Sequence, residues 1–183
     1  QWEHILNFLA MRAIPGVETV RDNKYYRTVH FINEKQHIYG WIQIEHQPVG
    51  STLKVTMSAT LLPVLSQVLA RVRHLFDLSC DPYAVYQALE SMNEINPELC
   101  VLGIRVPGSF NPFEMAVRAV LGQQITIKAA RTLAARLTEN FGTPIQTGID
   151  GLTHVFPEPE DILNLKDKIN EYLGKIGMIQ TRS

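Results

Sequence analysis

The sequence predicts an α+β protein in which an N-terminal antiparallel sheet with helices is followed by an all-α second half. Three observations lead to this fold class. Residues 2–14 place apolar side chains at helical spacing, residues 24–58 contain three segments rich in aromatic and β-branched residues, and residues 111–141 return to helical spacing. With 183 residues, the chain is long for one domain and short for two large ones.

The first helix is expected to stop at Pro15 and Gly16, after which residues 17–20 could begin a strand. Turn-forming residues separate the three strand candidates that follow, and short connections favour an antiparallel sheet. These candidates are residues 24–32, 37–44 and 52–58, and the second of them alternates with Ile38, Gly40, Ile42 and Ile44 on one face.

A long helix is expected over about residues 62–78, because its apolar stripe is wide enough to cover one face of a sheet. Asp81 and Pro82 form a helix start, so a short helix should run to about Met92. The following loop-like stretch contains two prolines and a glycine. We therefore expect a domain boundary there, between residues 1–105 and residues 106–183.

The second half begins with a helix signature: Asn111 as the cap, Pro112 at the first helical position and Glu114 at the third. Gly122 is expected to end this helix, and Thr126 is expected to cap the next one. That second helix should end at Gly142, and a further helix is expected from Pro159 to about Leu173, after a looser segment.

Composition excludes several classes of protein. The chain is 45% hydrophobic and 19% charged, typical of an ordinary folded protein, and contains no apolar run long enough to span a membrane. Its two cysteines and six histidines show no metal-binding spacing, so neither a metal nor another cofactor is expected. Because the chain starts without an initiator methionine and ends abruptly, we expect it to be a piece of a longer protein.

Positive charge is concentrated in one region. The net charge is −1, but residues 105–136 carry five cations and one anion, a local charge of +4. This bias surrounds the sequence RAVLGQQIT, residues 118–126, where two adjacent amides lie between two apolar helical segments. A solvated helix face would produce the same charge bias, so the bias alone is weak evidence for a nucleic-acid partner.

The junction between the two helices could face DNA. The exposed N–H groups of the second helix would attract phosphate, with Lys128 and Arg131 just beyond, and the two amides could bond base edges or fill a gap in a base stack. In the alternative interpretation, Gln123 bonds the backbone of the turn and Gln124 lies in solvent.

The segment PGSFNPFEMAVRAVLGQQITIKAARTLAARLTENFG, residues 107–142, resembles the opening helices of helix-hairpin-helix DNA glycosylases. The whole chain resembles the AlkA-type 3-methyladenine DNA glycosylase II family, because residues 2–20, 24–31, 74–82 and 105–114 fit that family in order. The resemblance implies that residues 1–105 form a TATA-binding-protein-like domain of mainly structural role. Residues 106–183 would be the first part of the glycosylase domain, truncated before its hairpin.

The resemblance also implies a function and a set of site residues. Such enzymes flip an alkylated base out of double-stranded DNA and hydrolyse its N-glycosidic bond without a metal. Phe8 matches a pocket-lining aromatic residue of that family, although a plain core role is the alternative. Gln123 matches the usual glutamine of the turn, and Gln124 matches the wedge residue, where the best-known members have leucine. The expected DNA contacts are Gln123, Gln124, Ile125, Thr126, Lys128 and Arg131.

The catalytic aspartate and the hairpin of the family are expected beyond Ser183, and Asp150, Asp161 and Asp167 do not match its place. The chain itself is therefore expected to be inactive, to self-associate through unpaired helix faces, and to be poorly ordered after about Ile145. Its parent would be a bacterial, cytoplasmic, nucleoid-associated repair enzyme. Two alternatives remain: a module of an Ada-type alkylation-response regulator fused to the glycosylase, and a non-catalytic DNA-binding relative.

Overall fold

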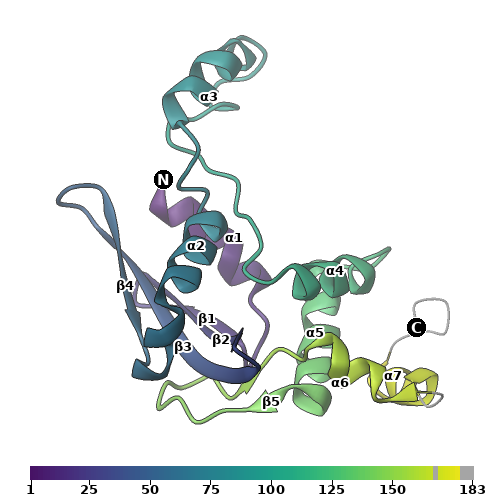
Figure 1. Cartoon of the computed structure of the whole chain (residues 1–183). Coiled ribbons are helices and arrows are strands. Elements are labelled where there is room, and N and C mark those ends of the chain that lie inside the picture. The colour runs from purple at the N-terminus through teal and green to yellow at the C-terminus, as the bar shows by residue number, and fades with distance from the viewer. Residues whose placement is uncertain (167–168, 178–183) are drawn as a thin grey trace.

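The computed structural model describes residues 1–166 and 169–177. A four-stranded antiparallel sheet lies beside two helices at the N-terminal end, and the second half is mainly helical (Figure 1). The α+β class is therefore confirmed. Asp167, which does not match the place of the catalytic aspartate, lies outside the described residues, as do the last six positions.

The sheet is a simple meander. Its order is β1-β2-β3-β4, with every neighbouring pair antiparallel. The expected strands are confirmed, with slightly different ends. The strands are β1 (Glu18–Arg21), β2 (Lys24–Asn33), β3 (Gln36–Gln47) and β4 (Thr52–Met57).

Two helices cover one face of this sheet. The helix α1 (Trp2–Arg12) buries Ile5, Leu6 and Leu9, the apolar stripe that the sequence predicted. The predicted helix over 62–78 is shorter: a 3-10 turn, η1 (Ala59–Val64), which contains Pro63, precedes α2 (Leu65–Leu75). Together with inward-facing residues of β2 and β3, these elements form the first hydrophobic core.

Gly40 allows η1 to lie directly on β3. A Cβ atom at Gly40 would stand 2.7 Å from the Cγ of Leu61, which is fully buried, and no carbon pair can approach that closely. The predicted alternation of β3 is confirmed at Gly40, Ile42 and Ile44, all of which are buried.

The short helix α3 (Pro82–Leu89) projects away from the sheet (Figure 1) and contains no buried residue. Its predicted cap is confirmed, because the Asp81 carboxylate accepts from the backbone N–H groups of Tyr83 and Ala84. The turn η2 (Glu90–Glu94) follows, and an irregular segment then leads back to the body of the molecule.

The second half contains α4 (Pro112–Leu121) and α5 (Ile127–Phe141), with the expected caps in place. The single helix expected over 159–173 is instead α6 (Pro159–Leu163) and α7 (Ile169–Lys175), because Lys166, with φ of 48°, departs from helical geometry. Buried residues of α5 and α7 pack against Ile14 and Val17, so the N-terminal half contributes to this second core.

The looser segment between α5 and α6 is tied to the sheet domain. It contains the short strands β5 (Thr143–Pro144) and β6 (His154–Val155), which pair with each other. The Gly16 carbonyl accepts from the backbone N–H groups of Thr153 and His154. The Thr28 hydroxyl donates to the His154 carbonyl at 2.7 Å. These contacts attach residues 153 and 154 to the sheet domain.

Candidate functional site

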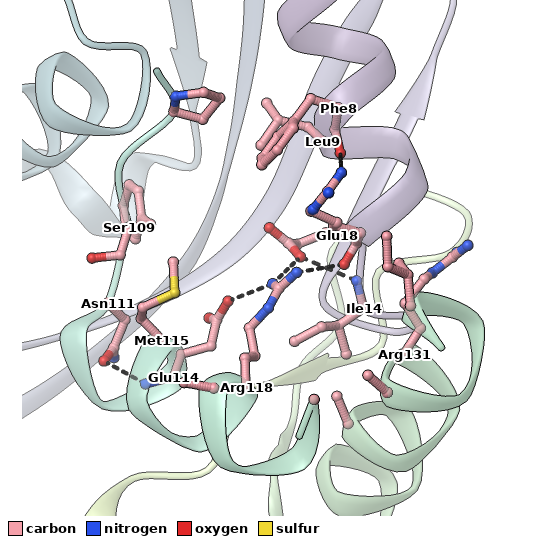
Figure 2. A pocket seen from close by; sticks show the side chains of 18 of the residues that line it. Phe8, Leu9, Ile14, Glu18, Ser109, Asn111, Glu114, Met115, Arg118 and Arg131 are labelled. Carbon is pink, nitrogen blue, oxygen red and sulfur yellow. Dashed lines mark hydrogen bonds and ion pairs between the residues drawn. The ribbon is translucent and has the colours of Figure 1, made fainter. Parts of the chain in front are cut away.

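A cavity of about 320 Å³ lies where α1, α4, the start of α5 and the segment before α4 converge (Figure 2). Its size falls in the range of small-ligand sites, about 300–1,000 Å³. Phe8 and Leu9 of α1 line it, and so do Met115 of α4 and Ala130 of α5. Residues distant in the sequence therefore form one concave surface.

Phe8 is placed at this cavity and is not a core residue. Its side chain is 37% exposed, whereas its neighbours Ile5 and Leu9 are 7% exposed. The guanidinium carbon of Arg12 lies 3.8 Å from the centre of the Phe8 ring, in cation–π geometry. The Phe8 ring is therefore covered on one face by a cation.

Three buried charged side chains and the partly buried Arg118 form the polar wall of the cavity. Arg27 of β2 lies 2.6 Å from Glu114 of α4 and 3.6 Å from Glu18 of β1. Arg118 of α4 contacts both carboxylates, Glu18 at 3.0 Å and Glu114 at 3.1 Å (Figure 2). We name Glu18, Arg27, Glu114 and Arg118 the ion cluster. Two anions and two cations balance within it, so it carries no net charge.

Further hydrogen bonds complete the ion cluster. The Glu18 carboxylate accepts from the Tyr25 hydroxyl at 2.5 Å and from the Ile14 backbone N–H at 3.1 Å. Arg118 also donates to the backbone carbonyl of Arg12 at 2.5 Å. The ion cluster therefore joins the end of α1, two strands of the sheet and α4.

The ion pairs and hydrogen bonds shift the pKa values of Glu18, Arg27 and Tyr25. Burial opposes the charge on Glu18, but Arg27 and Arg118 outweigh it and lower the pKa of that carboxyl. Burial likewise opposes the charge on Arg27, yet Glu114, Tyr25 and Glu18 raise the pKa of its guanidinium. Burial together with the Glu18 carboxylate raises the pKa of the Tyr25 phenol well above its ordinary value. Glu18 and Arg27 are thus charged and the Tyr25 phenol is neutral at physiological pH.

The sequence did not predict the ion cluster. Glu114 was expected to be only the third residue of a helix signature, but its carboxylate faces Arg27 and Arg118, while the Asn111 side chain alone caps the helix. A usable signal was present: Arg27 interrupts the otherwise aromatic and β-branched strand KYYRTVHFI. A charged residue in such a strand requires a buried partner.

The turn between α4 and α5 places its two amides at the surface, where both side chains are exposed. The left-handed residue of this turn is Gln124, with φ of 57°, and not Gly122, whose φ is −79°. The expectation that Gly122 ends α4 is confirmed, because the helix runs to Leu121 and Gly122 caps its C-terminus. A side chain in the left-handed conformation is strained, as is common at functional positions.

The other predicted contact residues surround this turn. Thr126 caps α5, and its hydroxyl accepts from the Ala129 backbone N–H at 3.2 Å. Lys128 is exposed on the first turn of α5. Arg131 lines the cavity and donates from Nε to the Ala13 carbonyl at 2.9 Å, so part of its guanidinium is engaged within the protein. Gly122 and Ile125, on either side of the two amides, also line the cavity.

Over residues 1–166 and 169–177, no group of three or more His, Cys, Asp or Glu side chains is arranged to hold a metal ion. In that same part of the chain, no helix has the length and apolar character that crossing a membrane requires.

Comparison with known proteins identifies the family of this chain. The family model described as the AlkA N-terminal domain matches residues 1–111. The chain belongs to this family. It is 37% identical over 173 residues to DNA-3-methyladenine glycosylase 2 of Escherichia coli, covering 94% of this chain. It is 33% identical over 169 residues, 90% of this chain, to the probable bifunctional transcriptional activator/DNA repair enzyme AlkA of Mycobacterium tuberculosis.

The chain spans 57% of the length of the E. coli relative and 32% of the M. tuberculosis relative. Solved structures share its fold. The 3-methyladenine DNA-glycosylase of Archaeoglobus fulgidus superposes with a TM-score of 0.76 at 20% identity, over all of this chain and 60% of that one. The 8-oxoguanine glycosylase/lyase of Clostridium acetobutylicum, bound to double-stranded DNA, superposes with a TM-score of 0.53 at 14% identity, over 93% and 52%.

Proposed function

We propose that this chain is part of a bacterial DNA glycosylase that flips and excises alkylated bases from double-stranded DNA. The observation that carries the proposal is the shared cavity of Phe8 and the amide turn. Phe8 lines the cavity from α1, while Gly122 and Ile125 line it on either side of Gln123 and Gln124. One surface therefore offers an aromatic face for a base beside a strained turn that could enter the duplex.

In this proposal, Gln124 fills the space that the flipped nucleotide leaves, and Gln123 holds the turn near the DNA. Flipping costs a few kcal/mol for unstacking and is easier at a damaged base, which contributes to selectivity. The side chain of Gln124 is amphipathic, so it can bond the orphaned base instead of acting as an apolar plug.

The other predicted contact residues would bind the sugar-phosphate backbone of the DNA. The first backbone N–H groups of α5 and the ammonium of Lys128 would bind phosphate, together with Ile125 and Thr126 at the turn. Arg131 would contribute mainly its electrostatic field, because its Nε already donates to Ala13. These contacts predict binding that weakens as salt rises.

We further propose that residues 1–105 act as a structural domain and that residues 106–183 form the beginning of the catalytic domain. The ion cluster supports a fixed relation between them, because Arg27 and Glu18 come from the sheet and Glu114 and Arg118 come from α4. A rigid junction keeps Phe8 beside the amide turn. The parent enzyme would act in the cytoplasm, on nucleoid DNA.

None of the 183 residues is proposed as the catalytic group. In the parent enzyme, an aspartate outside this sequence would stabilise the positively charged sugar of the transition state and help water attack. We therefore expect the chain to bind damaged DNA without releasing a base.

The test uses a duplex that carries one N-methylated purine and a matched undamaged duplex. The chain should bind the damaged duplex more tightly by fluorescence anisotropy and should release no free base over hours. The E. coli relative is the positive control for release. Equal binding of both duplexes would refute the DNA-damage function, and base release would refute the placement of the catalytic group.

Exposed apolar side chains also support self-association of this chain. Met115 and Val120 of α4 and Ile127 of α5 are each more than 40% exposed. Exposed apolar patches favour association. We expect a second copy to cover them, so gel filtration should show a dimer that dissociates on dilution. A monomer at high protein concentration would contradict this.

The fusion to an Ada-type regulator is the less favoured alternative, because the relative that is 37% identical is named as a glycosylase alone. If the protein is instead a non-catalytic DNA-binding relative, a longer protein expressed from the same gene should also fail to excise a base.

A further inference from the structure

The cavity contains two arginines that the ion cluster does not neutralise. Arg12 and Arg131 both line it, and within the described residues neither forms an ion pair with a carboxylate. The balanced cluster leaves the cavity wall with two net positive charges. Such a wall repels a cationic base, although it suits a DNA phosphate.

Arg12 occupies the place that a cationic base would need. Its guanidinium is planar and positively charged, and it lies 3.8 Å from the centre of the Phe8 ring. A planar purinium cation would bind the same ring face by the same cation–π attraction. The guanidinium and the base therefore cannot occupy that face together.

The stack differs from the buried pair of Arg27 and Phe110. Arg27 lies 4.4 Å from the centre of the Phe110 ring, but both residues are buried and Arg27 is held by two carboxylates. Arg12 is only partly buried, and its guanidinium makes one long hydrogen bond of 3.4 Å to the Phe8 carbonyl. Its side chain can therefore leave the ring at small cost.

We propose that Arg12 is a specificity-determining gate on the base site. It covers one face of the Phe8 ring, and a flipped base stacks on that face only by displacing it. The gate rests on the proposed function, because it treats Phe8 as the face that receives the base. It imposes a competition on every base that stacks on this ring face, and a cationic base must in addition approach the positive charge of Arg12.

The competition between Arg12 and a cationic base can be measured as a change in the affinity for that base. A guanidinium that covers a half-exposed ring leaves the free ring as a minor state, so its removal should tighten binding of a cation by about three- to six-fold. The probe is the 7,9-dimethyladeninium cation, and neutral 9-methyladenine serves as its uncharged counterpart. Binding is measured from the Phe8 ring resonances by NMR of the 183-residue chain.

The variants separate stacking from charge. Arg12→Gln should tighten binding of the cation three- to six-fold and tighten binding of neutral 9-methyladenine less, because the neutral base gains the uncovered ring face but no relief from charge repulsion. Arg12→Lys should lie between wild type and Arg12→Gln. Arg131→Gln is the matched control, because it removes one charge from the same cavity and covers no aromatic ring among the described residues; it should change binding of the cation much less.

Three results would overturn the gate: no tightening in Arg12→Gln, equal tightening in Arg131→Gln, or a cation that fails to shift the Phe8 resonances in any variant. Binding of the damaged duplex is measured separately. If the duplex binds selectively while Arg12→Gln has no effect, the gate fails and the proposed function stands. If the gate is observed without selective duplex binding, the proposed function fails.

Discussion

Arg27 and Glu114 are separated by 87 positions, yet their side chains meet at 2.6 Å and each is at most 6% exposed. This contact fixes α4 on the sheet. Breaking a buried pair from one side leaves an uncompensated charge, which is far more costly than losing an exposed pair.

Glu114→Ala should therefore lower the free energy of unfolding by about 3–5 kcal/mol. Urea denaturation followed by circular dichroism measures this. Glu171→Ala is the control, because it breaks an exposed pair with Lys175 on α7 and should have no measurable effect. A loss below about 1 kcal/mol for Glu114→Ala would show that the ion cluster is not structural.

Acid should destabilise the protein through Glu18. Its pKa in the folded state is lowered from an ordinary value of 4.5 because, although burial opposes its charge, Arg27 and Arg118 favour it. A lowered pKa gives stability that is present above pH 4.5 and lost as the pH falls through the lower folded-state value. Unfolding free energies measured from neutral to acidic pH should fall steeply in this window. Glu18→Gln should show a smaller change, and an identical acid profile would contradict the assignment.

Thr138 has a buried hydroxyl that no described group bonds, on a residue that is 1% exposed. Burying a hydroxyl without a partner is unfavourable, and valine has nearly the same shape. Thr138→Val should raise the free energy of unfolding by about 1 kcal/mol. Thr132→Val is the comparison, because the Thr132 hydroxyl is exposed and donates to Lys128. If Thr138→Val destabilises the chain, the hydroxyl has a partner in solution.

Gln124 is expected to lower the stability of the fold while strengthening binding to DNA. A side chain in the left-handed region costs about 1–2 kcal/mol, and the extra backbone entropy of glycine offsets about 0.5–1 kcal/mol of that. Gln124→Gly should therefore stabilise the chain while weakening its binding to damaged DNA. Gln123→Gly should give no such gain, since Gln123 is not among the left-handed residues of the described chain. Loss of stability in Gln124→Gly would exclude strain at this turn.

Local signals predicted local structure well. The apolar stripe of α1, the alternation of β3 and the caps at Asn111 and Thr126 depend on residues within one turn or one strand, and the structure has all of them. The resemblance to a family added the position of Phe8 at the cavity, for which a plain core role was the alternative.

Long-range structure could not be read in the same way. The ion cluster joins residues about 90 to 100 positions apart, and a sequence pattern does not show which Glu meets which Arg. The same limit applies to the return of residues 152–154 to Gly16, which depends on backbone hydrogen bonds and leaves no side-chain pattern. Glycine favours the left-handed region, but in this turn Gln124 adopts it, and no signal in the sequence predicted that.

The central claim is that Gln124 enters the gap left by a flipped nucleotide. Fluorescence anisotropy with a duplex containing a stable abasic-site analogue tests it most directly, because that duplex already has the gap. We predict that the chain prefers this duplex to an intact one and that Gln124→Ala reduces the preference about five-fold or more, a change of about 1 kcal/mol. Gln87→Ala, an exposed amide on α3, should retain it. A preference that is absent, or that survives Gln124→Ala unchanged, would contradict the claim.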